Sequence, residues 1–156
     1  MDPRLGLVLL VHLALAAIGG WLIVIDARTH RLPDRIVLPT LGALLALVAV
    51  DALASGDHAA ALRAALGMAV LCGFYALLRL VSRAGMGGGD VKLAAVIGLV
   101  LAWHGWTPFL IGAASAFVLG AMYALALLAL RRADRRTRIA FGPWMIIGAV
   151  IGLAAG

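Results

Sequence analysis

Two aspartates stand out because of the sequence beside each of them. Asp26 ends the apolar run 21–25, whereas Asp90 follows a glycine-rich stretch and precedes the apolar residues 91–103. An ionisable side chain at membrane depth is costly unless it is paired or hydrated, so each is a candidate functional residue. Two neighbouring carboxylates share one proton, because like charges do not both ionise at low cost. Such a pair can activate water and protonate a carbonyl, which is the chemistry of an aspartyl protease.

The helix ends on which these aspartates are expected give each a different electrostatic environment. Asp26 is placed at a helix C-terminus, where the dipole disfavours negative charge, and Asp90 at an N-terminus, where dipole and backbone N–H groups favour it. We hypothesise that Asp90 is the base that takes a proton from water and Asp26 the acid. Two structural interpretations stay open: Asp26 as an interfacial acid paired with Arg28 or Arg31, and Asp90 as an N-cap.

The stretch before Asp90 holds four glycines within residues 85–89. Glycine adopts backbone conformations closed to other residues and lets a second chain approach closely, which suits a site that receives an extended peptide. We therefore expect Gly87, Gly88 and Gly89 to shape the site. A phosphate-binding loop is disfavoured, because no strand precedes the stretch and no Walker Lys-Ser/Thr pair follows it.

For the remaining aspartates, a structural role is the preferred interpretation. Asp34 precedes the apolar residues 36–50 and is predicted to be the N-cap of that span, although it competes with Asp26 for the catalytic role and remains a candidate site residue. The other four are expected to be solvated loop charges: Asp2, Asp51, Asp57 and Asp134.

The composition predicts that a membrane surrounds these residues. Hydrophobic residues make up 65% of the 156 positions, and the mean hydropathy is +1.10, whereas soluble domains are about half apolar. A helix needs about 20 apolar residues to cross a bilayer. We expect one all-α, multi-pass domain, residues 1–156, with about six spans, the second and fourth being short. The first is expected to be retained, because residues 1–4 lack the basic character of a signal peptide. The expected spans are 5–25, 36–50, 59–81, 91–103, 109–130 and 139–155.

The positive charges predict the orientation of the spans. Three connections hold eleven of the thirteen Lys and Arg residues, and such residues are retained on the cytoplasmic side. Both termini are therefore expected outside a bacterial inner membrane, with the paired aspartates at its cytoplasmic face. The net charge of +6 lies between spans, which disfavours nucleic-acid binding but allows contact with anionic lipid headgroups. These residues are Arg28, Arg31, Arg35, Arg79, Arg83, Lys92, Arg131, Arg132, Arg135, Arg136 and Arg138.

Neither a metal nor another cofactor is expected. The single cysteine, Cys72, lies inside the third expected span and cannot form an internal disulfide or a cysteine-based zinc site. The four histidines show no ligand spacing along the sequence; they are His12, His30, His58 and His104.

The sequence around both aspartates resembles the type IV prepilin peptidases, relatives of the archaeal preflagellin peptidases. Residues 25–34 with Leu38-Pro39 are similar to the family's first aspartate region. Residues 85–93 are similar to the second, with the Gly-x-Gly-Asp signature shared with presenilin-like intramembrane proteases. The interval of 64 residues between the two aspartates agrees with the family, and residues 141–144 resemble a third, weaker feature.

The resemblance implies that Asp26 and Asp90 are catalytic, with Lys92 and the glycines as close neighbours. It also implies the substrate: prepilin-like or pseudopilin precursors with a basic leader, cut before a hydrophobic helix during assembly of a pilus or a type II-like secretion system. Longer family members carry a cytoplasmic domain with paired Cys-x-x-Cys zinc ligands and methylate the new N-terminus. This chain opens in an expected span and has one cysteine, so no methyltransferase activity is expected.

Two other classes of protein remain open from the residues alone. A small proton-coupled transporter also uses intramembrane aspartates, but near the midplane of the membrane rather than at the ends of spans. A non-catalytic assembly subunit of a pilus or secretion machine is the second. The particular pilin and the oligomeric state stay undetermined.

Overall fold

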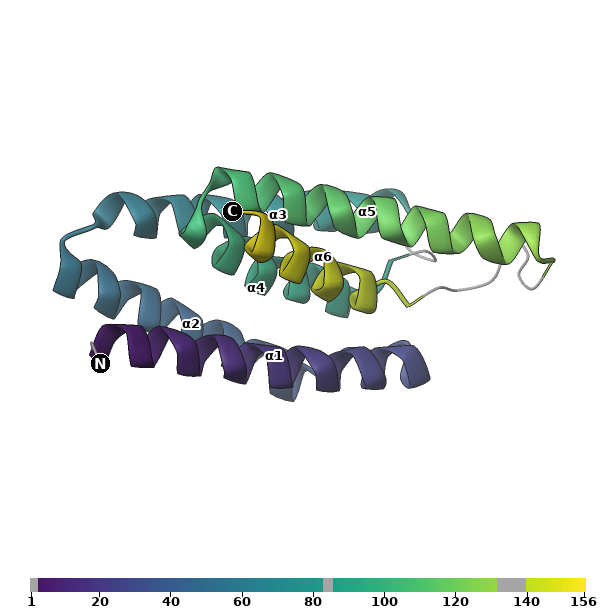
Figure 1. Cartoon of the computed structure of the whole chain (residues 1–156). Coiled ribbons are helices and arrows are strands. Elements are labelled where there is room, and N and C mark those ends of the chain that lie inside the picture. The colour runs from purple at the N-terminus through teal and green to yellow at the C-terminus, as the bar shows by residue number, and fades with distance from the viewer. Residues whose placement is uncertain (1–2, 83–85, 132–139) are drawn as a thin grey trace.

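The computed structural model describes residues 3–82, 86–131 and 140–156, and every regular element within these ranges is an α-helix. In Figure 1, α1, α3 and α5 end at the right-hand end of the bundle, where α2, α4 and α6 begin. Both chain termini lie toward the opposite end (Figure 1). The helices are α1 (Pro3–Thr29), α2 (Asp34–Ser55), α3 (His58–Val81), α4 (Gly88–His104), α5 (Trp106–Ala129) and α6 (Gly142–Ala155).

The helices form because a bilayer offers the backbone no hydrogen-bonding partner, so apolar spans must satisfy their own N–H and C=O groups. Four helices are long and apolar enough to cross a membrane, namely α1, α2, α3 and α5, and α6 is a shorter apolar helix of 14 residues. The expectation of an all-α multi-pass membrane protein is confirmed. The second span is not short, however: α2 has 22 residues and continues to Ser55, so Asp51 belongs to a helix rather than a loop.

The centre of the bundle is α4, which packs against α2, α3, α5 and α6. All residues from Leu93 to Ala102 are buried, in agreement with a helix that is apolar on every side. Glycines allow its close approach to α3: a Cβ atom on Gly67 would lie 2.7 Å from the carbonyl oxygen of Gly98. The same device joins α5 to α6, where a Cβ on Gly148 would lie 2.6 Å from the oxygen of Gly112.

Helix α1 lies at the edge of the bundle and packs on α6. Its buried residues are Gly19, Leu22 and Asp26, spaced by three and four positions and therefore on one helical face. A Cβ on Gly19 would lie 3.1 Å from Ile146 of α6, so this face follows α6 closely. The pattern turns the Asp26 side chain toward the bundle interior rather than toward lipid.

Candidate active site

The Asp26 carboxylate is buried, with 4% of the residue exposed. Its Oδ2 accepts a 3.0 Å hydrogen bond from the backbone N–H of Gly142, the first residue of α6. The first N–H groups of a helix have no partner within it, so the carboxylate satisfies one of them. The alternative pairing is wrong: Arg28 and Arg31 are exposed, and in the part of the chain described neither forms an ion pair with Asp26.

Asp90 is the second buried carboxylate, with 8% of the residue exposed. Its Oδ2 accepts a 2.9 Å hydrogen bond from the backbone N–H of Gly87. The N-cap of α4 is Gly87 rather than Asp90, which corrects the N-cap interpretation. Asp90 occupies the third helical position and reaches back to the cap, as the acid of a capping box does.

These two aspartates are the only buried charged residues within the described ranges. Their carboxylates interact electrostatically with each other. Asp26 lies in the last turn of α1 and Asp90 in the first turn of α4, and both helix ends belong to the same end of the bundle. The structure therefore brings together two acids that are far apart in the sequence, close to the ends of their helices rather than at their midpoints.

The glycines before Asp90 allow the start of α4 to fit between its neighbours. A Cβ atom on Gly89 would lie 2.7 Å from the Cβ of Leu32, in the connection between α1 and α2. A Cβ on Gly88 would collide with the guanidinium of Arg79 at the end of α3. Gly87, which is exposed, supplies the N–H that holds Asp90. Gly85, also part of the predicted stretch, lies outside the described residues.

Asp34 and Lys92 form a salt bridge at the rim of the site. Lys92 Nζ donates to Asp34 Oδ2 over 2.6 Å, and the two side chains are 38% and 55% exposed, respectively. The predicted N-cap role of Asp34 is wrong, because Pro33 holds that position without a side-chain capping bond and Asp34 is the first residue of α2. The exposed, paired Asp34 does not take the place of Asp26 beside Asp90.

Two site neighbours were missed by the sequence reasoning. Tyr75 of α3 is only 1% exposed and interacts electrostatically with Asp90. Its ring packs against Phe117 and Phe141, with centroids 5.5 and 6.0 Å apart, respectively, so aromatic rings adjoin the acids. Arg79, which also interacts with Asp90, is predicted from the sequence only as one of the cytoplasmic charges that orient the spans. Nothing in the apolar pattern of α3 distinguishes Tyr75 from its neighbours. Residues 141–144, which include its neighbour Phe141, did carry a signal, because they resemble the third, weaker family feature.

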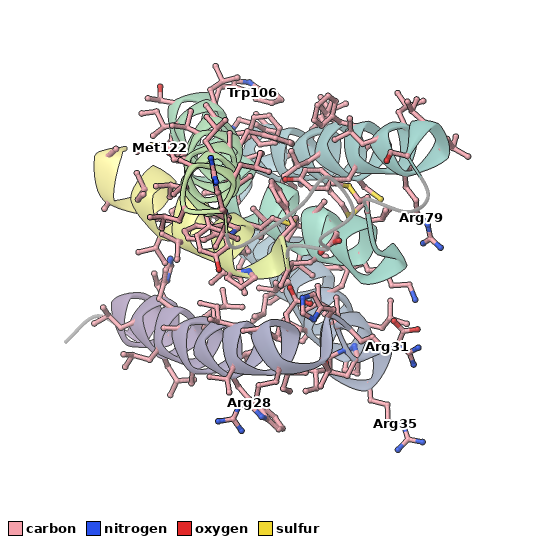
Figure 2. The ribbon with its side chains drawn as sticks, turned by 90° about the vertical axis from the view of Figure 1, so that its right-hand side faces the viewer. Arg28, Arg31, Arg35, Arg79, Trp106 and Met122 are labelled. Atoms are coloured by element: carbon pink, nitrogen blue, oxygen red, sulfur yellow. The ribbon has the colours of Figure 1, made fainter. Side chains whose placement is uncertain are left out.

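Figure 2 looks onto the end of the bundle that holds these acids, with the side chains drawn as sticks. Arg28 and Arg35 point outward at its periphery. Several predicted cytoplasmic charges, and the loop aspartates at positions 2 and 134, lie outside the described residues: Arg83, Arg132, Arg135, Arg136 and Arg138. The fold and the site thus define a multi-pass α-helical membrane protein with a pair of buried carboxylates near one end of its spans.

The chain belongs to the type IV leader peptidase family, whose model matches residues 13–125. It is 38% identical over 133 residues to the prepilin leader peptidase/N-methyltransferase of Escherichia coli (strain K12), covering 83% of this chain and 56% of that protein. It is 37% identical to the protein of the same name from Pseudomonas aeruginosa, covering 85% and 44%, respectively. It is 36% identical over 151 residues to the protein of the same name from Dickeya chrysanthemi, covering 95% of this chain and 51% of that protein.

The chain spans about half the length of these curated relatives. No solved structure is significantly similar to it.

Proposed function

We propose that this chain is an aspartyl endopeptidase that cleaves the leader peptide from prepilin-like precursors, with Asp26 and Asp90 as its catalytic pair. The observation that carries the proposal is the burial of both carboxylates, 4% and 8% exposed, within electrostatic reach of each other. The names of the relatives state prepilin leader cleavage for those proteins. Membership of the same family supports the same substrate class here.

The hydrogen bonds of the two acids support a shared-proton mechanism. Each carboxylate has its Oδ2 held by a backbone N–H, so that the Oδ1 atoms are the oxygens left for water and substrate. Asp90 takes a proton from water, the water oxygen attacks the scissile carbonyl carbon, and Asp26 donates its proton to the carbonyl oxygen. As the tetrahedral intermediate collapses, the C–N bond breaks, the leaving amine takes the proton from Asp90, and one hydroxyl of the intermediate returns its proton to Asp26 as the carbonyl re-forms.

The position of the acids near the helix ends suits the proposed substrate. A prepilin places a positive leader in the cytosol and an apolar helix in the lipid, so its scissile bond partitions to the interface. We propose that the Asp26 and Asp90 end faces the cytoplasm of an inner membrane and that both termini face outward. The glycines at 87–89 would accept an extended peptide there, and the Asp34–Lys92 pair would border it.

The proposal covers one transmembrane peptidase domain, residues 1–156, and cleavage alone. Methyl transfer, which the relatives' names include, is left out because a single cysteine provides no paired Cys-x-x-Cys ligands. Incubating the purified protein with a prepilin and a labelled methyl donor checks this expectation, since methylated product would contradict it.

Cleavage of a purified prepilin, followed by the appearance of the shortened product, tests the proposal. Asp26→Asn and Asp90→Asn should each lower turnover by at least about 1000-fold, since each removes one partner of the acid–base pair. Asp57→Asn is the matched control: Asp57 is the exposed N-cap of α3, and Asn caps a helix equally well. The wild-type pH profile should be bell-shaped; wild-type turnover in either site variant would overturn the proposal.

A further inference from the structure

The structure brings together two histidines that the sequence separates by 92 residues. His12 of α1 and His104, the last residue of α4, face each other with their Nε2 atoms 3.2 Å apart. Their rings are nearly perpendicular, at 82°, with centroids 5.1 Å apart. The pair lies toward the end of the bundle opposite Asp26 and Asp90, and nothing in the proposed peptidase mechanism uses it.

The hydrogen bonds at the other ring nitrogens indicate which nitrogen of each ring is the donor. Nδ1 of His12 lies 2.7 Å from the carbonyl oxygen of Val8, and Nδ1 of His104 lies 2.8 Å from that of Val100. A carbonyl oxygen only accepts hydrogen bonds, so each Nδ1 is the donor. In a neutral imidazole the second nitrogen then has no hydrogen and presents a lone pair. When both rings are neutral, two lone pairs face each other across 3.2 Å, an arrangement that a shared cation turns from repulsive to attractive.

We propose that His12 and His104 bind a divalent transition-metal ion, with zinc as the reference ion, through their two Nε2 atoms. A tetrahedral zinc with Zn–N bonds of about 2.0–2.1 Å places two ligand nitrogens about 3.3 Å apart and their ring centres about 5.2 Å apart. The observed 3.2 and 5.1 Å agree with this metal-centred geometry.

The surroundings of the pair agree with this assignment. A histidine that binds a metal almost always donates its other ring N–H to a carbonyl or carboxylate, which fixes the tautomer and orients the ring. Both histidines do so, each to the carbonyl four residues earlier in its own helix. Within the described ranges no group of three or more His, Cys, Asp or Glu side chains could hold a metal, so water would complete the coordination. Imidazole ligands suit zinc, copper and nickel.

Such a site would fix the relative position of the two helices that carry the acids. His12 precedes Asp26 by fourteen residues in α1, and Asp90 precedes His104 by fourteen in α4. At a rise of 1.5 Å per residue, both intervals are about 21 Å. The helices run in opposite directions, so the two pairs mark opposite ends of one α1–α4 alignment. Since α1 packs mainly on α6, a metal at His12 and His104 would add a direct link to α4.

The test is zinc binding by the full-length protein in detergent micelles after treatment with a chelator. Titration calorimetry with zinc chloride should show one ion per chain, and saturating zinc should raise the thermal unfolding midpoint by several degrees (about 2–8 °C). His12→Ala and His104→Ala should each lose both effects. His12→Cys, which keeps a zinc ligand, should retain them. His58→Ala is the matched control, since His58 is an exposed histidine at the start of α3.

Two results would overturn the proposal. The first is zinc binding that is absent from the wild type or equal in the wild type and both alanine variants. The second is a thermal unfolding midpoint that rises on acidification in metal-free buffer but does not respond to zinc. This result would show that the cation shared by the two histidines is a proton. Both readouts are independent of peptide cleavage, so failure here leaves the proposed peptidase activity intact.

Discussion

The backbone N–H of Gly142 donates a 3.0 Å hydrogen bond to the carboxylate of Asp26, across 116 residues of sequence. This bond joins the start of α6 to the end of α1. The two helices that meet at this bond also pack along their length. The orientation of Asp26 is therefore set by α6 as much as by its own helix.

Gly142→Ala should displace the acid without unfolding the bundle. A Cβ atom at this position would lie 2.6 Å from Asp26 Oδ2 and 3.2 Å from its Cγ, so the carboxylate must shift. A misplacement of about 1 Å costs on the order of 100-fold in turnover. We expect a loss of at least about 10-fold in prepilin cleavage, with helix content by circular dichroism unchanged. Gly73→Ala is the control, because nothing lies within 4 Å of a Cβ there; equal turnover in both variants would contradict the argument.

The two glycines at the start of α4 should differ in their tolerance of alanine. At Gly89 the added Cβ meets the Cβ and the backbone nitrogen of Leu32, at 2.7 and 3.3 Å, and the backbone does not yield easily. At Gly88 the three nearest atoms all belong to the guanidinium of Arg79, the flexible end of a long, exposed side chain. Gly89→Ala is therefore expected to lower prepilin turnover by at least about 10-fold more than Gly88→Ala.

The comparison between these glycines also tests the substrate-binding hypothesis. If conformational freedom of the segment were the main requirement, both variants would lose turnover equally, because alanine stiffens both positions. Arg79→Ala combined with Gly88→Ala removes the collision and should have wild-type turnover if Arg79 contributes only bulk. A double variant with much lower turnover than Gly88→Ala would show that Arg79, which interacts with Asp90, is itself needed.

The sequence allowed the helices and the acids to be predicted, because both depend on local signals. Apolar runs bounded by charge and glycine locate six helices, and Asp26 and Asp90 stand at the ends of two of them. The contacts of the acids could not be predicted from the sequence, because the partner of Asp26 is a backbone N–H, that of Gly142, and every residue except proline has one. The N-cap prediction for Asp34 failed because α2 begins at Asp34 itself, with Pro33 as its N-cap, and the Asp34 carboxylate pairs with Lys92, 58 residues later.

The Asp34–Lys92 salt bridge should contribute little to stability despite its short 2.6 Å contact. Both side chains are more than a third exposed, so water and salt screen the pair, and exposed pairs contribute about 0–1 kcal/mol. A double-mutant cycle with Asp34→Asn and Lys92→Met, followed by thermal unfolding, should give a coupling below about 1 kcal/mol that shrinks further in 1 M salt. If either variant still loses prepilin turnover, the residue acts on substrate or on Asp90 rather than on folding.

A coupling energy above about 2 kcal/mol would instead show that the Asp34–Lys92 salt bridge contributes substantially to the packing of α2 on α4. Arg28→Met is a matched single-charge control for these measurements. Its side chain points away from the bundle in Figure 2, and its removal should change the free energy of unfolding by no more than about 0.5 kcal/mol.

Arg63 of α3 should stabilise the far end of α4. Its Nε donates to the carbonyl oxygen of Ala102 over 2.6 Å, and its Nη2 donates to that of Trp103 over 2.7 Å. The last carbonyls of a helix have no partner within it, and a positive charge there also complements the helix dipole.

Arg63→Met keeps most of the apolar stem but removes both donors, so it should lower the free energy of unfolding by about 1.5–3 kcal/mol. The free energy of unfolding of Arg63→Lys should lie between those of the wild type and Arg63→Met, because an ammonium group lacks the planar fork that reaches two carbonyls at once. Thermal unfolding in detergent measures the effect. Prepilin turnover well below the unfolding midpoint should stay at the wild-type level, because Asp26 and Asp90 lie at the other end of the bundle; a loss of turnover without a loss of stability would contradict this separation.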